Sequence, residues 1–154
     1  MRTTEQRALR VGGTATYTDA KLTTAAPFLA AAAGTRIPFS PKLAFALNGS
    51  YSFPISDGYS GVLTVTDRFS GERNAGFGTA KSVGYRLPSY NTVNVDLALS
   101  TPHNVEFDLY AHNLTNSYGR ISAYTAPLLT NPASPVEVLI AQPRTIGVVA
   151  KFEF

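Results

Sequence analysis

The side chains best able to do acid–base or metal chemistry lie close together in the sequence, between positions 96 and 112. Glu106, Asp108 and His112 are separated by even numbers of residues, so a β-strand would place all three on one face. Two carboxylates and an imidazole on one face could bind a metal ion or act as a general acid and base. Asp96 and His103 precede them and offer the same functional groups.

Other features of the sequence weigh against that chemistry. The spacing matches no metal-binding motif, and a row of polar side chains facing water accounts for these residues without catalysis. The chain contains no cysteine and no signature of a phosphate-binding loop, a nucleophilic serine elbow or a zinc peptidase helix. We therefore predict that the chain is not an enzyme and needs no metal ion or cofactor.

The composition favours a membrane β-barrel wall over a soluble domain. Charged residues make up 15% of the chain, whereas about a quarter is usual in soluble domains. The mean hydropathy is close to zero, so the apolar residues are spread along the chain, as they are when alternate residues face lipid. The net charge is +3, but lysine and arginine occur singly, so we expect no nucleic-acid partner.

The sequence contains no candidate for a membrane-spanning helix or an export signal. The longest apolar stretch, Ala25 to Ala33, is about half as long as the roughly 20 residues that a transmembrane helix requires. Residues 1–7 lack the apolar region of a signal peptide. If the chain resides in a membrane, we expect it to do so as strands, and either to have lost its export signal or to be part of a longer polypeptide.

The dominant period of the sequence is two, the period of a β-strand. Val93, Val95 and Leu97, for example, alternate with Asn94 and Asp96. Such alternation predicts about six strands of roughly ten to twelve residues, and the alternating segments themselves are residues 9–19, 43–53, 59–69, 93–100, 105–112 and 145–154. Strands of soluble proteins are typically about five or six residues long, whereas a tilted strand needs about nine to eleven residues to cross a bilayer.

The connections between the predicted strands alternate in length. Residues 54–58 and 101–103 form short turns, whereas residues 20–41, 70–90 and 114–143 form long loops. Outer-membrane barrels have short periplasmic turns and long extracellular loops. With this order, the last strand would run inward and end at the periplasm.

The predicted strands have one polar and one apolar face. The polar face would carry Asn94, Asp96, Glu106, Asp108, His112, Lys151 and Glu153, as in a watery lumen. Aromatic residues gather near strand ends, as in the girdles at the two surfaces of a bilayer: Tyr51, Phe53, Tyr59, Phe69, Phe152 and Phe154. The aromatic residues could equally form the core of a soluble β-sandwich, so this pattern alone does not separate the two folds.

Several short motifs, in order along nearly the whole chain, resemble the C-terminal barrel region of TonB-dependent outer-membrane receptors. Residues 17–21 (YTDAK) resemble the end of a strand before an outer loop, and residues 34–42 (GTRIPFSPK) the start of the next strand. Residues 87–96 (LPSYNTVNVD) are similar to the lead into the antepenultimate strand, and residues 113–116 (NLTN) stand where the family often has Asn-Leu-Phe-Asp. Residues 143–154 resemble its last strand, including the terminal Phe154.

The resemblance implies an all-β fold, in which residues 1–154 are an antiparallel meander of about six to eight long strands from the C-terminal part of a transmembrane β-barrel. Such a receptor, in the outer membrane of a Gram-negative bacterium, would import a scarce nutrient such as siderophore-bound iron, a cobalamin or a glycan. Its partners would be outer-membrane lipid, the barrel-assembly machinery and the TonB system, the last through an N-terminal part of the receptor. The family's plug domain is not found in residues 1–154, and about six strands cannot close a barrel of about twenty-two.

The resemblance also implies roles for particular residues. Ligand contacts are expected in the three long loops, where Arg73, Lys81, Arg86 and Arg120 could meet an anionic ligand or remain ordinary solvated charges. The C-terminal aromatics Phe152 and Phe154 would help the assembly machinery recognise the last strand. They could also serve as interface anchors.

One alternative is a small self-contained barrel, in the membrane or soluble, that binds a ligand. Eight strands suffice for such a barrel. Further strands near residues 83–87 and 136–141 would complete the set. The second of these segments could instead extend a strand above the membrane.

Overall fold

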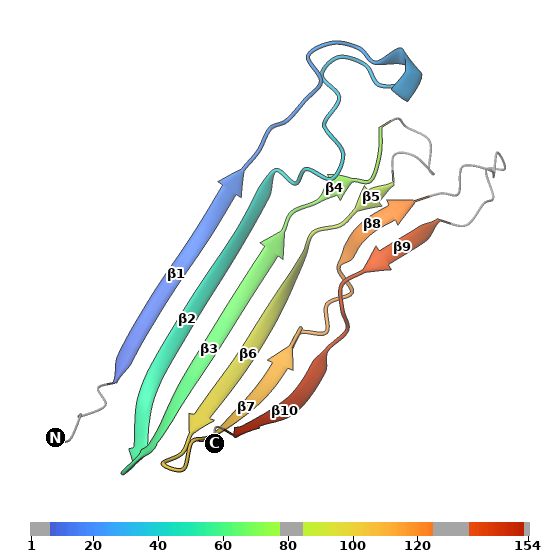
Figure 1. Ribbon diagram of the computed structural model, residues 1–154. Coiled ribbons are helices and arrows are strands. Elements are labelled where there is room, and N and C mark those ends of the chain that lie inside the picture. Colours follow the sequence, from blue (N-terminus) through green and yellow to red (C-terminus); the bar gives the residue numbers. More distant parts are fainter. Residues whose placement is uncertain (1–6, 78–84, 125–135, 153–154) are drawn as a thin grey trace.

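The chain forms one large antiparallel sheet with long loops at one end (Figure 1). A computed structural model describes residues 7–77, 85–124 and 136–152. The sheet has the strand order β1-β2-β3-β6-β7-β10. These strands are β1 (Ala8–Tyr17), β2 (Leu43–Ser56), β3 (Tyr59–Ser70), β6 (Tyr90–Ser100), β7 (Val105–His112) and β10 (Thr145–Phe152). The predicted all-β antiparallel meander is confirmed, and each predicted strand overlaps an observed one.

Two small two-stranded sheets lie beyond the main sheet, together with one turn of 3-10 helix. Their strands are β4 (Arg73–Asn74) with β5 (Arg86–Leu87), and β8 (Arg120–Tyr124) with β9 (Glu137–Ile140), and the helix is η1 (Pro27–Leu29). β5 and β9 fall within the two segments where further strands were predicted. They pair outside the main sheet, however, and β1 and β10 lie at its opposite edges, so the described strands form an open wall.

No helix in the described part of the chain is long and apolar enough to cross a membrane.

The two short turns lie at the same end of the sheet. The prediction of a turn from Pro54 onward was wrong, because β2 continues to Ser56 with a bulge between these two residues. A bulge tolerates proline, which has no N–H for the strand ladder. Gly58 has a φ of 77°, a backbone conformation that side chains disfavour. A Cβ there would come within 3.0 Å of Pro102 in the second turn, so the two turns pack together.

The three long connections lie at the opposite end, so the predicted alternation of short and long connections is confirmed. The first connection contains η1, the second carries β4 and β5, and the third carries β8 and β9. In Figure 1 the start of β1 and the end of β10 lie toward the short turns, and the small sheets lie beyond the far ends of the main strands.

The strand register separates two faces as the sequence predicts. Thr64 pairs with Asp96, and Asp96 pairs with Tyr110, so polar side chains share one face, here called the polar face. On the other face, here called the apolar face, Leu63, Leu97 and Leu109 form one row. Further residues of the apolar face are Leu9, Val11, Leu47, Tyr51, Val65, Val95, Leu99, Phe107, Ile146, Val148 and Phe152.

Among the described residues the apolar face is not covered by a second layer. Val11 is 77% exposed and Ile146 is 70% exposed. The apolar residues that are buried are Ala31, Leu87, Ala123 and Ala141, and none of them belongs to the six main strands. Water disfavours an exposed apolar surface of this extent.

Aromatic residues mark two levels on the apolar face. Phe45 of β2 and Phe69 of β3 stack with ring centroids 5.0 Å apart near the loop end. Phe53 of β2 stands in the row of Leu99 and Phe107 near the turn end. The two levels are separated by eight residues of β2, which is about 20 Å of height for a tilted strand. An apolar band between aromatic girdles in outer-membrane barrels is about 25 Å tall.

Candidate functional site

The charged residues at the turn end of the polar face are paired with one another. Lys151 of β10 contacts Glu106 at 2.9 Å and Asp108 at 2.5 Å, both on β7. Lys151 stands directly opposite Glu106 in the register, and Asp108 is the next residue of β7 on that face. The two carboxylates therefore share one ammonium group and are not poised for acid–base chemistry.

The two histidines and Asp96 lie away from this group of paired charges. His112 Nε2 lies 3.1 Å from Asp96 Oδ1, across β7 and β6. His103 is exposed in the short turn between these strands. Same-face neighbours along a strand are roughly 7 Å apart, so Glu106, Asp108 and His112 are spread along β7. In the part of the chain that the structure describes, no three His, Asp or Glu side chains are grouped closely enough to hold a metal ion.

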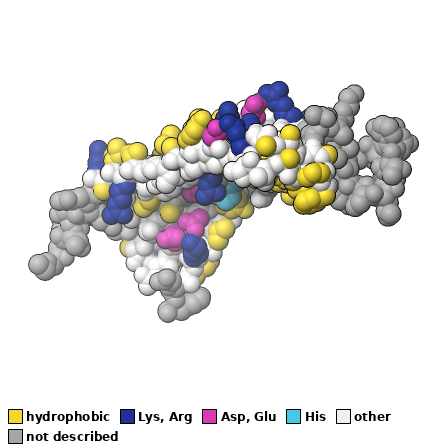
Figure 2. Space-filling model, turned by 90° about the horizontal axis from the view of Figure 1, so that it is seen from above, with side chains coloured by type: hydrophobic (Ala, Val, Ile, Leu, Met, Phe, Trp, Pro, Cys, Tyr) yellow, Lys and Arg dark blue, Asp and Glu magenta, His cyan; other side chains and the backbone are white. Residues whose placement is uncertain are grey.

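A cleft of about 340 Å³ opens on the polar face just below the loops. Its floor carries Arg68 of β3, Thr92 and Asn94 of β6, and His112 of β7. Its upper border is formed by loop residues and by β8, namely Asn113, Ile121, Ala141, Gln142 and Pro143. Figure 2, seen from above the loop end, shows acidic, basic and histidine side chains gathered toward the middle of the view. This cleft is the candidate ligand site within the wall.

Arg73, predicted as a ligand contact, is a support for the loops. Its side chain is 6% exposed. One terminal nitrogen donates to Ser70 Oγ at 3.1 Å, and the other donates to the carbonyl oxygens of Arg120 and Ile121 at 3.1 and 3.0 Å. Its guanidinium also lies 5.6 Å from the centre of the Tyr90 ring. Arg73 thus ties the second long connection to the third.

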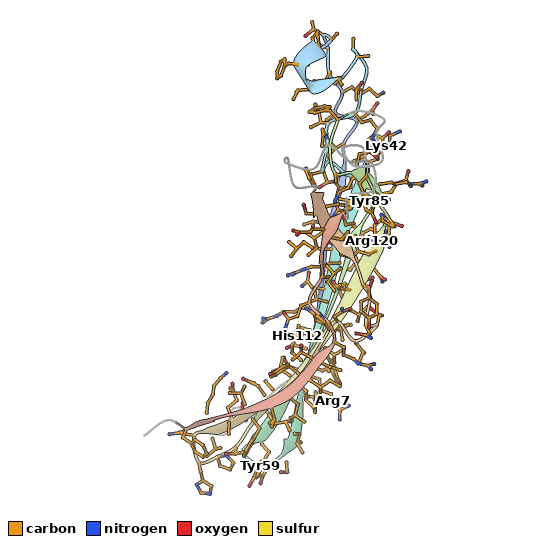
Figure 3. The ribbon with its side chains drawn as sticks, turned by 90° about the vertical axis from the view of Figure 1, so that its right-hand side faces the viewer. Arg7, Lys42, Tyr59, Tyr85, His112 and Arg120 are labelled. Atoms are coloured by element: carbon orange, nitrogen blue, oxygen red, sulfur yellow. The ribbon has the colours of Figure 1, made fainter. Side chains whose placement is uncertain are left out.

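Arg86 and Arg120 lie at the surface of the loops, where they were expected. Arg86 donates to the exposed carboxylate of Glu72, and this hydrogen bond lowers the pKa of Glu72. Arg120 donates to the Tyr85 hydroxyl and packs over its ring, 5.7 Å from the centroid. Figure 3 shows Tyr85 and Arg120 together toward the loop end, with His112 farther down the wall. Lys81 lies outside the described residues.

The motif at residues 113–116 follows β7 and forms hydrogen bonds to the segment just before β10. The Asn113 side chain is almost completely buried, and its Nδ2 donates to the carbonyl oxygens of Ser117 and Gln142. Its Oδ1 accepts from the Ser117 N–H, and its own N–H donates to Asn94 Oδ1. Asn116 Oδ1 accepts the N–H of Arg144. The motif therefore fixes where the last strand starts.

Phe152 ends β10 on the apolar face and is 61% exposed. It pairs with Val105 at the turn end of the sheet. Phe154 lies outside the described residues. The predicted role of both residues as an assembly signal stays a prediction.

Sequence reasoning missed Arg68, because cations were sought only in the long connections. The signal was present, since Arg68 alternates with Val65, Asp67 and Phe69 and shares the parity of Thr64. Period two therefore places it on the polar face.

Comparison with known proteins decides the family. The family profile described as "TonB dependent receptor-like, beta-barrel" matches residues 4–114. The chain belongs to this family. The resemblance stated from the sequence is thereby confirmed, and the family is one of receptors, not of enzymes.

A solved structure shows the same fold in a much longer protein. The chain is similar to the ferric-catecholate import receptor Fiu from E. coli K12 in its open form, with a TM-score of 0.53 and 20% sequence identity. The match covers 75% of this chain and 16% of the Fiu chain, so the chain spans a small part of that receptor's length. No curated protein matches the chain.

Proposed function

We propose that the chain forms a section of the wall and three outer loops of an outer-membrane receptor that imports a scarce nutrient. The observation that carries this proposal is the exposed apolar face of a six-stranded sheet whose long loops all lie at one end. Lipid would cover that face, and the polar face would line the lumen. The TonB-dependent family and the fold shared with Fiu support the same reading.

The nutrient we propose is siderophore-bound iron, a cobalamin or a glycan. Fiu, by its description, imports ferric catecholates, which makes the siderophore class the first to test. Energy would come from TonB through an N-terminal part of the longer polypeptide. Phe152 and Phe154 would serve recognition by the barrel-assembly machinery in a Gram-negative outer membrane.

Within the loops, Arg86 and Arg120 are the proposed contacts for an anionic ligand, because both are exposed. Lys81 remains proposed from the sequence. Arg73 would act indirectly, by holding the loops in place, because its donors are already engaged.

Cell fractionation tests the proposed location. We expect the longer polypeptide that contains this section of wall in the outer-membrane fraction, extracted only with detergent, and we expect its gel migration to change on heating, as for a closed barrel. Heat-modifiable migration of the chain by itself would instead favour the small self-contained barrel. A monomer that is soluble without detergent would contradict the proposal. Growth on single iron, cobalamin or glycan sources, with and without the gene, then identifies the nutrient class.

A further inference from the structure

We propose that the cleft around Arg68 is a binding subsite for an anionic group that presents two oxygens, such as a carboxylate or a phosphate. This inference rests on the proposed function, because it assigns the polar face to the lumen. It adds a site on the wall itself, separate from the loop cations Arg86 and Arg120.

Arg68 is a cation on the polar face that has no partner among the described residues. Its side chain is exposed on β3, in the row between Ala46 and Thr92. No hydrogen bond or ion pair to any residue in the described ranges engages its guanidinium. The contrast with Arg73 is direct, since Arg73 is buried and its guanidinium is held by Ser70 and by backbone carbonyls. Arg68 therefore retains its donors for a ligand.

The described residues around Arg68 are rich in hydrogen-bond donors. No Asp or Glu is among the described residues that line the cleft. Asn94 Oδ1 already accepts the N–H of Asn113 at 2.9 Å, which leaves the Asn94 amide nitrogen as a donor. The neighbouring acid, Asp96, lies deeper on the same strand face and is held by His112. An anion entering the cleft would meet donors without facing an unpaired carboxylate.

The shape of a guanidinium selects the class of ligand. Its planar fork matches two oxygens of a carboxylate or a phosphate, and such bidentate hydrogen bonds are stronger than neutral ones. The Thr92 hydroxyl and the Asn94 amide, which also line the cleft, could complete the contact. A neutral sugar can accept hydrogen bonds from a guanidinium, but it has no charged pair of oxygens to form the stronger bidentate interaction.

Protection of Arg68 from phenylglyoxal, read by mass spectrometry on the purified protein in detergent, tests the inference. The probes are citrate and inorganic phosphate, with glucose as the neutral comparison. For a Kd of about 5 mM, a probe at about 10 mM should slow modification of Arg68 about threefold. Arg10 is the internal control, because it is exposed on the same polar face but outside the cleft. Thr92→Val, which removes one hydroxyl, should reduce the protection.

Three outcomes would overturn the inference. The first is equal protection of Arg10 and Arg68, which would indicate general attraction of anions. The second is protection of neither residue. The third is an Arg68 that resists phenylglyoxal before any anion is added, which would mean that another part of the same protein already pairs with it. Because fractionation tests the membrane location separately, loss of the subsite alone leaves the proposed function standing, whereas a protein that is soluble without detergent would count against the proposed function itself.

Discussion

A charge placed halfway up the apolar face should destabilise the protein far more than the same charge on its neighbour. Val65 and Thr66 are adjacent in β3, similar in shape, and point to opposite faces. Val65 stands in the row of Gly49 and Val95, midway between the two aromatic levels of the apolar face. In a bilayer, Val65→Arg therefore places a guanidinium close to the midplane.

The expected magnitude follows from this depth. Arginine at the midplane of a lipid-facing barrel surface costs about 2–4 kcal/mol, and the cost falls to roughly 0–1 kcal/mol near the interfaces. Steric crowding adds little, because even a Cβ added at the neighbouring Gly49 would meet nothing within 4 Å. Thr66→Arg places its charge on the polar face and should cost less than about 1 kcal/mol.

Unfolding in guanidinium chloride of the polypeptide reconstituted in phospholipid vesicles measures the loss of stability in both variants. Leu99→Arg adds a depth control, because Leu99 shares the row of Phe53 and Phe107 near the interface. We expect Val65→Arg to be the most destabilising of the three. Equal losses for Val65→Arg and Thr66→Arg would refute the assignment of faces. Equal losses for Val65→Arg and Leu99→Arg would refute the membrane position.

Three further predictions concern the loop end. Arg73→Met should lower the free energy of unfolding by about 2–3 kcal/mol, because the backbone carbonyls that bind its guanidinium lose their charged hydrogen-bond donor. Limited proteolysis should then cut the loops faster. An unchanged cleavage rate would count against a role of Arg73 in linking the loops. Asn113→Ala should lower the free energy of unfolding, measured with denaturant, by a similar amount of about 2–3 kcal/mol, because it removes buried hydrogen bonds and places alanine at a φ of 50°. Asn113→Gly relieves only the backbone strain and should recover part of the lost stability. The hydrogen bond from Arg86 lowers the pKa of Glu72 below its ordinary value of 4.5. The pair therefore stabilises the β4–β5 hairpin above that pH, and this stabilisation is lost as the pH falls through the lowered pKa. Hydrogen exchange of the hairpin should rise in acid, and Glu72→Gln should abolish that pH dependence.

Much of the fold was predictable because it follows from local alternation. The register confirms that the polar side chains from Asn94 to Lys151 share one face, as period two indicated. The long and short connections also emerged from the spacing of turn residues. Local pattern failed at strand ends, where β2 continues past Pro54 through a bulge. It also gave no pairing partners for β5 and β9, which join β4 and β8 outside the main sheet.

The candidate site depended on contacts between distant parts of the chain. Arg73 and Arg86 look alike in sequence, yet only the folded chain brings the carbonyls of Arg120 and Ile121 to Arg73 and buries it. Lys151 likewise reaches Glu106 from 45 residues away.

The sequence by itself determined which residues share a face, because side chains of a strand alternate regardless of what the strand pairs with. Only the tertiary structure decided which charges are paired and which, like Arg68, have no partner in the part of the chain that the structure describes. The reason is physical, since pairing depends on which strands become neighbours and in what register, and neither is contained in a local period.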